Sequence, residues 1–87
     1  PSNVPHISFG NISVYPNPAT SYVVIESPEV VVDLVRMYNI NGQLVREIRG
    51  GINGHTRFDV QDLNQGLYLL KVITGNQVYS TKLLISR

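Results

Sequence analysis

The residues that could carry out acid–base or metal chemistry are few and dispersed. The two histidines, His6 and His55, stand far apart, and neither belongs to an HxH or HxxxH pair of the kind that binds zinc. The six Asp and Glu residues form no calcium-binding loop. Asp59 and Asp62 lie where we expect turn bonding and solvation. The sequence therefore predicts neither a metal site nor a cofactor.

Residues capable of nucleophilic attack or ligand stacking give no stronger signal. The chain has no cysteine, and no serine lies in a Gly-x-Ser-x-Gly elbow. Tyr22 and Tyr38 could stack on a sugar, but tyrosines on strands more commonly pack against neighbouring side chains. The sequence therefore predicts that the chain is not an enzyme.

Tyr68 stands where a structural tyrosine is expected. It follows the turn glycine Gly66 by two residues and begins an expected strand. This spacing is typical of a tyrosine corner in β-sandwiches, in which the hydroxyl bonds a backbone group a few residues upstream. We predict a hydrogen bond from the Tyr68 hydroxyl to the main chain near Leu63 or Asn64; a ligand-stacking role is the alternative.

The motif Tyr15-Pro16-Asn17-Pro18 predicts a rigid turn between two strands. Each proline fixes φ, removes a backbone donor and restricts the residue before it, so a strand cannot continue through the motif. Asn17 can also bond the backbone locally. A recognition element is the alternative interpretation of this motif.

Further turns are expected at glycines. Asn41-Gly42 predicts a two-residue type I′ hairpin, since both residues tolerate positive φ. Gly75-Asn76 predicts a second tight hairpin. The glycines at positions 50, 51 and 54 predict a flexible loop.

These turns separate segments that are rich in strand-forming residues. Twelve valines and eight isoleucines stand against a single alanine, Ala19, and lysine and glutamate together number five. β-Branched residues favour strands, and few helix formers are present. We therefore expect an all-β antiparallel sandwich or partly open barrel, with seven strands at residues 12–15, 21–26, 30–39, 44–49, 56–60, 67–74 and 77–86. A further short strand is expected at residues 7–9.

Alternation within the last two expected strands assigns their side chains to the core or to the surface. In the last strand the uncharged set is placed inward: Tyr79, Thr81, Leu83 and Ile85. The set placed outward is Val78, Ser80, Lys82, Leu84 and Ser86. In the preceding strand we place inward Tyr68, Leu70 and Val72, and outward Leu67, Leu69, Lys71 and Ile73. Asp33 shares a face with apolar residues, which predicts a β-bulge beside it.

The chain as a whole fits one small domain. Its 87 residues are 43% hydrophobic, enough for a packed core that must provide stability without disulfides. The net charge of +1 gives no basic field for nucleic acid, and no apolar run is long enough to span a membrane. We expect a linker or leading arm over residues 1–10 and the folded domain over residues 11–87.

Four motifs, taken in order, resemble the type A C-terminal sorting domains of the type IX (Por) secretion system of Bacteroidetes. They are VYPNPAT at residues 14–20, YNINGQLV at 38–45, LNQGLY and the following strand at 63–72, and KLLI at 82–85. The resemblance covers residues 12–87. The order of the motifs, with the last at the chain terminus, is more specific than any one of them.

The resemblance implies a seven-stranded, Ig-like β-sandwich that follows a covalently attached cargo protein on its N-terminal side. The precursor would cross the inner membrane by an N-terminal signal and be recognised in the periplasm by the outer-membrane translocon. A sortase-like peptidase would then remove the domain, leaving the cargo on the cell surface or released. The alternative is an Ig-like or carbohydrate-binding accessory module of an extracellular enzyme, which would show exposed aromatics clustered on one face.

The resemblance also places the export signal in the terminal strand, at residues 82–85 and Arg87. Arg87 stands where the family more commonly has lysine, so the charge is kept. Because Lys82, Leu84 and Arg87 face outward or lie at the end, we predict that they form the surface recognised by the translocon. An open edge on this strand could also accept a strand from another molecule, including a second copy of the domain.

Overall fold

The fold consists of antiparallel strands. The computed structural model describes residues 7–9 and 12–86, and all their side chains except those of residues 7–9 and 50–53. The six strands of this part are β1 (Ile7–Phe9), β2 (Ile12–Tyr15), β3 (Tyr22–Tyr38), β4 (Leu44–Asp59), β5 (Gly66–Thr74) and β6 (Val78–Ile85). Their hydrogen-bonded order is β1-β2-β3-β5-β6, and β4 pairs with β3.

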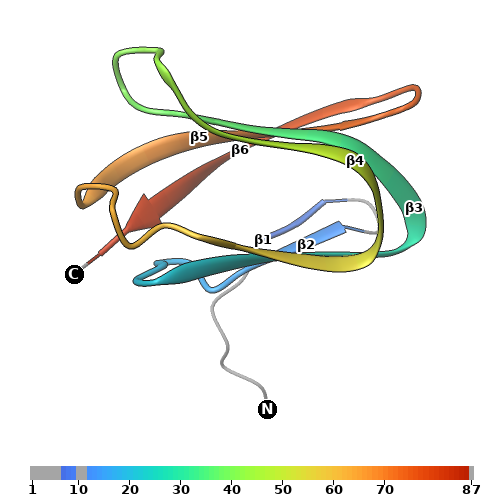
Figure 1. Ribbon diagram of the computed structural model, residues 1–87, viewed down its shortest axis with the longest axis horizontal. Helices are drawn as coiled ribbons and strands as arrows, with labels where there is room; N and C mark the ends of the chain where they lie inside the picture. The colour runs from blue at the N-terminus through green and yellow to red at the C-terminus, as the bar shows by residue number, and fades with distance from the viewer. Residues whose placement is uncertain (1–6, 10–11, 87) are drawn as a thin grey trace.

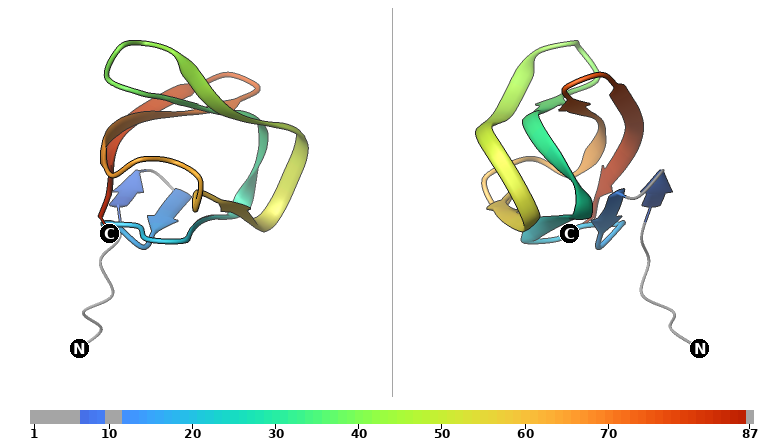
Figure 2. Two further views of the ribbon diagram at one scale, coloured as in Figure 1. Left: turned by 60° about the vertical axis from the view of Figure 1, so that its left-hand side comes forward. Right: turned by 90° about the vertical axis from the view of Figure 1, so that its right-hand side faces the viewer.

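The sheet folds back on itself into two layers (Figures 1 and 2). β3 and β4 form a long hairpin that bends, so that each strand contributes to both layers. The N-layer contains β1, β2, the start of β3 and the end of β4. The C-layer contains the end of β3, the start of β4, β5 and β6. The result is an antiparallel β-sandwich, which confirms the predicted all-β class and is compatible with an Ig-like arrangement.

The predicted number of seven strands is wrong, because two pairs of expected strands are continuous. The expected strands at 21–26 and 30–39 merge into β3, and those at 44–49 and 56–60 merge into β4. Pro28 does not end β3, because the β3–β4 register skips from Ser27 to Val32 and no ladder bond needs its missing N–H. The glycines expected to form a loop lie within β4, where Gly54 has a φ of +94° and pairs with Ser27 at the start of this irregularity.

The core lies between the two layers and is apolar. Its fully buried side chains are Ile12, Val14, Ala19, Val23, Ile25, Val32, Val35, Met37, Val60, Leu70, Val72, Leu83 and Ile85. Val45, Ile48 and Phe58 of β4 pack against this cluster. The alternation predicted for β5 and β6 is confirmed, because their inward residues are buried or half-buried while Leu67, Leu69, Val78 and Leu84 are exposed.

The predicted bulge at Asp33 is confirmed. Val32 pairs with Thr74 and Leu34 with Ile73, so that β3 has one more residue than β5 at this point. The extra residue is Asp33, whose side chain is exposed. The bulge therefore keeps Val32 buried while excluding a carboxylate from the core.

The hairpin at Asn41-Gly42 forms, but its predicted two-residue type I′ geometry is wrong. Gly42 has a φ of +82°, whereas Asn41 has no positive φ. The amide of Gly42 donates to the carbonyl of Asn39 at 3.0 Å, and the Asn39 amide donates to the carbonyl of Gln43 at 2.9 Å. These bonds define a three-residue loop, in which a turn is followed by a left-handed glycine. Sequence reasoning missed Asn39, whose Oδ1 accepts from the amides of Asn41 and Gln43.

The two other predicted turn features are confirmed. The Thr74 amide donates to the Gln77 carbonyl at 2.9 Å, closing a two-residue loop at Gly75-Asn76. The Tyr68 hydroxyl donates to the carbonyl of Asn64 at 2.6 Å, which is the predicted tyrosine corner. Gly66 lies between Asn64 and Tyr68 in the sequence. Its φ of +149° is a conformation that other residues rarely adopt.

The terminal strand offers a matched test of the face assignment. Leu83→Ala should lower the free energy of unfolding by about 2–5 kcal/mol, because it removes buried methyl groups and leaves a cavity. Leu84→Ala removes the same atoms from the exposed face and should cost about 0.5 kcal/mol or less. Urea unfolding followed by circular dichroism measures both changes. Equal losses in the two variants would contradict the assignment.

The tyrosine corner can be tested by removing one oxygen. Tyr68→Phe should lower the free energy of unfolding by about 1 kcal/mol, because it deletes the bond to the Asn64 carbonyl. Tyr22→Phe removes a hydroxyl from the outer face and serves as the control. If both variants have the wild-type urea midpoint, the corner does not stabilise the domain.

Candidate functional site

Successive side chains of the terminal strand β6 alternate between the core and the surface. Leu83 and Ile85 are fully buried. Leu84, between them, is 41% exposed, and Lys82 is also exposed. Two of the three predicted recognition residues therefore lie on the outer face of the C-layer. The third, Arg87, lies outside the described residues.

The end of β6 is held by the segment that contains the predicted proline turn. The Ala19 amide donates to the Leu84 carbonyl, and the Ser86 amide donates to the Ala19 carbonyl, both at 2.8 Å. These bonds form a parallel bridge between Ala19 and Ile85. The Leu84 amide also donates to Oδ1 of Asn17 at 3.0 Å. The predicted turn at residues 15–18 therefore positions a short segment against the terminal strand.

We call the contact of Asn17 and Ala19 with the end of β6 the clasp. It covers part of the edge of β6 that was predicted to be open. The end of β6 already has a backbone neighbour on each side, β5 and the clasp. From Val78 to Lys82, β6 pairs with β5 and has no second strand neighbour among the described residues. The edge that could accept a strand is thus limited to the first part of β6. Sequence reasoning missed the role of Ala19, because its backbone partners Leu84 and Ser86 are far away in the sequence.

The outer face of the C-layer combines leucines with basic residues. The register places Leu67 opposite Leu84, and Leu69 between Lys82 and Tyr38. Leu67 is 43% exposed and Leu69 is 36% exposed. Lys71 lies beside Arg36, and its Nζ is 5.6 Å from the centroid of the Tyr38 ring. The predicted outward set of β5 and β6 therefore forms one continuous face.

Glu47, the acidic residue on this face, forms ion pairs with two arginines. Glu47 accepts from Nε of Arg36 at 2.8 Å and from Nε of Arg49 at 3.0 Å. The hydrogen bond from Arg36, followed by that from Arg49, lowers the pKa of Glu47. The same hydrogen bond, donated by Arg36 to the Glu47 carboxylate, is the main reason that the pKa of Arg36 is raised. Glu47 and Arg36 therefore remain charged at neutral pH.

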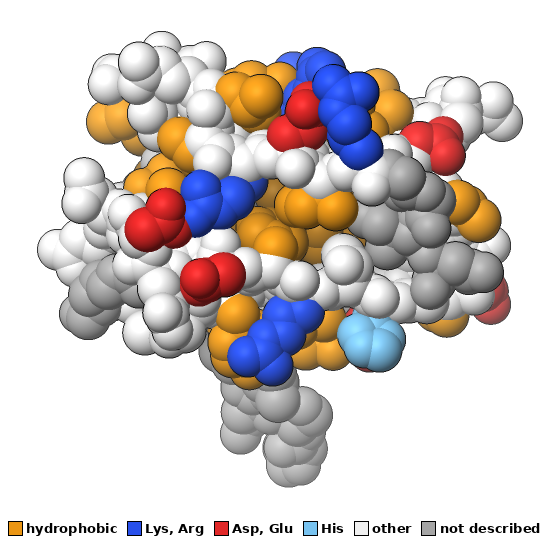
Figure 3. Space-filling view, in the orientation of Figure 1, with side chains coloured by type: hydrophobic (Ala, Val, Ile, Leu, Met, Phe, Trp, Pro, Cys, Tyr) orange, Lys and Arg blue, Asp and Glu red, His pale blue; other side chains and the backbone are white. Residues whose placement is uncertain are grey.

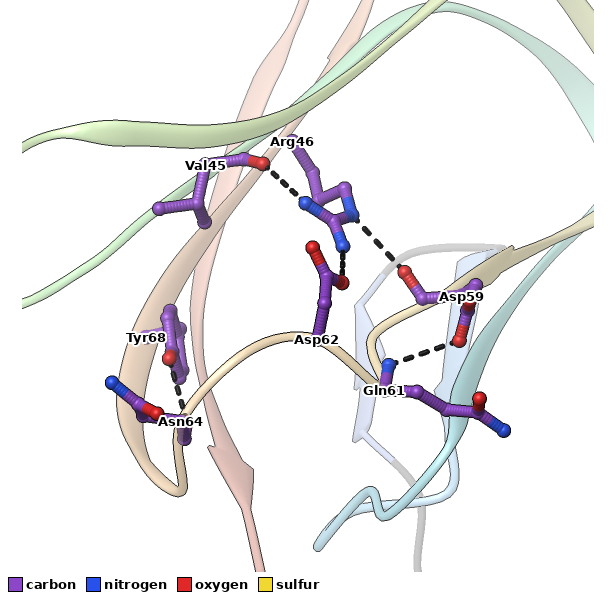
Figure 4. Close-up of polar contacts among 7 residues, drawn as sticks. All are labelled: Val45, Arg46, Asp59, Gln61, Asp62, Asn64 and Tyr68. Atoms are coloured by element: carbon purple, nitrogen blue, oxygen red, sulfur yellow. Dashed lines mark hydrogen bonds and ion pairs between the residues drawn. The ribbon is translucent and has the colours of Figure 1, made fainter.

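Asp59 and Asp62, the two acidic residues expected to bond in a turn, have a structural role (Figure 4). Arg46 of β4 forms an ion pair with Asp62 and donates to the carbonyls of Asp59, at 3.0 Å, and Val45, at 2.7 Å. Asp59 accepts from the Gln61 amide at 2.9 Å, as expected of a turn. Arg46 thus links the two layers beside the hydrophobic side chains that are visible between them in Figure 3.

No cluster of metal ligands forms around a histidine in the described part of the chain. No group of three His, Asp or Glu side chains there could hold a metal ion. His55 lies on β4 opposite Glu26, and His6 lies outside the described residues. The described part of the chain also contains no helix that is long and apolar enough to cross a membrane.

The two tyrosines considered for ligand stacking, Tyr22 and Tyr38, lie on different surfaces. Tyr22 and Tyr38 lie at the two ends of β3, on the outer faces of different layers. The Arg57 guanidinium lies 4.2 Å from the centroid of the Tyr22 ring, as Lys71 lies over Tyr38. Tyr68 is buried in the core. Tyr22 and Tyr38 therefore do not form one aromatic surface of the kind expected of a carbohydrate-binding module.

The clasp can be tested at its side-chain contact. Asn17→Ala should lower the free energy of unfolding by about 1 kcal/mol, because the Leu84 amide loses its acceptor. The same variant should accelerate hydrogen exchange at the Leu84 amide, measured by NMR. Asn76→Ala, in an exposed hairpin loop, is the control. Wild-type exchange at Leu84 in the Asn17 variant would show that the clasp does not protect β6.

Comparison with known proteins agrees with this arrangement. The family model described as "Secretion system C-terminal sorting domain" matches residues 13–86. The chain is 27% identical over 77 residues to ulvan lyase NLR42 of Nonlabens ulvanivorans, a match that covers 87% of this chain and 14% of that protein. No solved structure matches the chain. Because the family match covers nearly the whole sandwich, the chain belongs to the C-terminal sorting domains of the type IX secretion system of Bacteroidetes, the signals that direct proteins across the outer membrane.

Proposed function

We propose that the translocon recognises this domain through the outward face of its terminal strand, at Lys82, Leu84 and Arg87. The observation that carries the proposal is the exposure of Lys82 and Leu84 on a strand whose other side chains, Leu83 and Ile85, anchor it in the core. Such a strand presents a cation and an apolar group at a constant spacing. That surface depends on the sandwich alone, so it is independent of the attached protein.

The chemistry of the strip suits binding by a protein partner. The Lys82 ammonium would attract an acidic surface and increase the rate of encounter, an effect that salt weakens. Leu84 would then contribute to affinity by leaving water, at about 25 cal/mol for each Å² of apolar surface buried. Neither contribution requires catalysis by the domain itself.

The wider sequence of events follows from the same role. A cargo protein attached to the N-terminal side of the domain would pass through the periplasm and bind the outer-membrane translocon through this strip. A sortase-like peptidase would then separate the domain from its cargo, which would remain at the cell surface or be released. Residues 1–6, which precede β1, contain two prolines and no Asp, Glu, Lys or Arg, which is the composition of a connecting arm.

Export of a reporter tests the proposal. A fluorescent protein that matures in the periplasm is placed behind an N-terminal signal peptide and before this chain, in a cell with a type IX system. The Lys82→Ala, Leu84→Ala, Arg87→Ala triple variant should leave a folded precursor in the periplasm. Its melting temperature should change little, because surface substitutions usually cost about 0.5 kcal/mol or less.

The matched control is a triple alanine variant at Glu26, His55 and Arg57, which are exposed on the N-layer. This control should be exported as efficiently as the wild type. Normal export of the Lys82, Leu84 and Arg87 variant, measured by cell fractionation, would show that another surface of the domain carries the signal.

A further inference from the structure

A groove opens on the outer face of the C-layer, beside the strip of Lys82 and Leu84. Its main hollow has a volume of about 550 Å³ and is lined by the tip of the β3–β4 hairpin, by β5 and by β6. Tyr38 and Ile40 contribute from the hairpin, Leu67 and Leu69 from β5, and Lys82 from β6. A smaller hollow of about 230 Å³ shares Ile40 and Leu67 and extends the groove towards residues 64–66.

The groove is lined by apolar side chains that the fold leaves in water. Ile40 is 80% exposed at the hairpin tip, which rises away from β5 in Figure 1. Leu67 and Leu69 are about two-fifths exposed. Single apolar residues on a surface need no explanation, but these three side chains line one concave surface. A partner that covered them would gain the free energy of removing that surface from water.

The charges around the groove are strongly unequal. Four basic residues share this face of the C-layer: Arg36, Arg49, Lys71 and Lys82. Glu47 lies among them, and its carboxylate is held by the first two. Of the chain's remaining carboxylates, Asp33 lies at the far end of β5, beside Gly75. Lys71 and Lys82 line the groove, and neither forms an ion pair with a carboxylate of the described residues.

The spacing of the two lysines fits an extended chain. Lys82 is opposite Leu69, and Lys71 is two residues further along the same strand. Residues in this diagonal relation are about 7–8 Å apart. In an extended peptide, alternate side chains lie on one side and are spaced by about 6.6 Å. Carboxylates at positions i and i+2 can therefore approach both lysines, and the side chain at i+4 then lies over Leu67 and Ile40.

We propose that the groove binds an extended acidic segment of a translocon component, with two alternating carboxylates on Lys71 and Lys82 and an apolar side chain on Leu67 and Ile40. The inference rests on the proposed function and names the chemistry of its partner. A polypeptide is favoured over a lipid surface because the site is concave and its two lysines are spaced like alternate side chains of an extended chain.

Peptide binding to the purified 87-residue chain tests the groove. The probe is the fluorescein-labelled, C-terminally amidated peptide Gly-Asp-Ser-Asp-Ser-Phe-Gly, titrated by fluorescence anisotropy. Two matched peptides replace both Asp residues by Lys, or Phe by Ser. We expect saturable binding of the acidic probe, at least fivefold weaker binding without Phe, and no saturation with the basic peptide. Equal binding of all three peptides would overturn the proposal.

Reversing the charge of Lys82 tests whether the acidic peptide binds in the groove. Lys82→Glu should weaken binding of the acidic peptide at least tenfold. Arg57→Glu makes the same change of charge on the N-layer and should change the affinity less than twofold. Melting curves confirm that both variants remain folded. If the two reversals have equal effects, or if Lys82→Glu has none, the groove is not the site.

Three further measurements test whether a second copy of the domain or a membrane occupies the groove, and distinguish failure of the groove from failure of the proposed function. A wild-type dimer that becomes monomeric on Ile40→Ser would make the groove an interface between copies and overturn the proposal. Binding to phosphatidylglycerol vesicles that Lys82→Glu abolishes, without saturable peptide binding, would assign the face to a membrane and also overturn the proposal.

In the reporter assay, the double variant Ile40→Ser, Lys71→Glu should reduce export. Normal export of that variant would refute the groove alone, whereas failure of the wild-type domain to direct export would refute the proposed function.

Discussion

The β3–β4 hairpin is the element on which the rest of the sandwich depends, because its backbone pairing continues from one layer into the other. Each of its strands supplies part of both layers, so the layers are joined by main-chain hydrogen bonds as well as by side-chain packing. Continuity requires a bend, which the register allows by leaving residues 28–31 of β3 unpaired with β4. Pro28 is tolerated there for the same reason.

On the side of the sandwich opposite the bend of this hairpin, the layers are joined by contacts of single residues instead of continuous strands. Arg46 links the start of β4 to the segment after its end, and the clasp joins the connection after β2 to the end of β6. The clasp works because Ala19 is small enough to be fully buried while its backbone pairs with Leu84 and Ser86. The terminal strand is therefore held on one side by β5 and on the other by a segment from the start of the chain.

Features set by short-range chemistry could be predicted from the sequence. Alternation placed Leu83 inward and Leu84 outward, glycine–tyrosine spacing located the Tyr68 corner, and a misplaced carboxylate located the bulge at Asp33. Features that depend on distant partners could not be predicted. Whether Pro28 ends a strand depends on whether a neighbouring strand needs its N–H, and the type of the Asn41-Gly42 turn depends on Asn39. The clasp and the groove join residues far apart in sequence, and no local pattern indicates either.

The position of the candidate surface ties recognition to folding. Lys82 and Leu84 are presented by the strand whose other residues, Leu83 and Ile85, complete the core. A domain of this size has a stability of about 5–10 kcal/mol, so exposure of either anchor would remove much of it. Loss of the core would also disperse Leu67, Leu69 and Lys71, which β5 holds beside the terminal strand only while the ladder is intact. A partner that binds this face therefore binds the folded domain, and the energetic coupling between core and surface requires no additional switch.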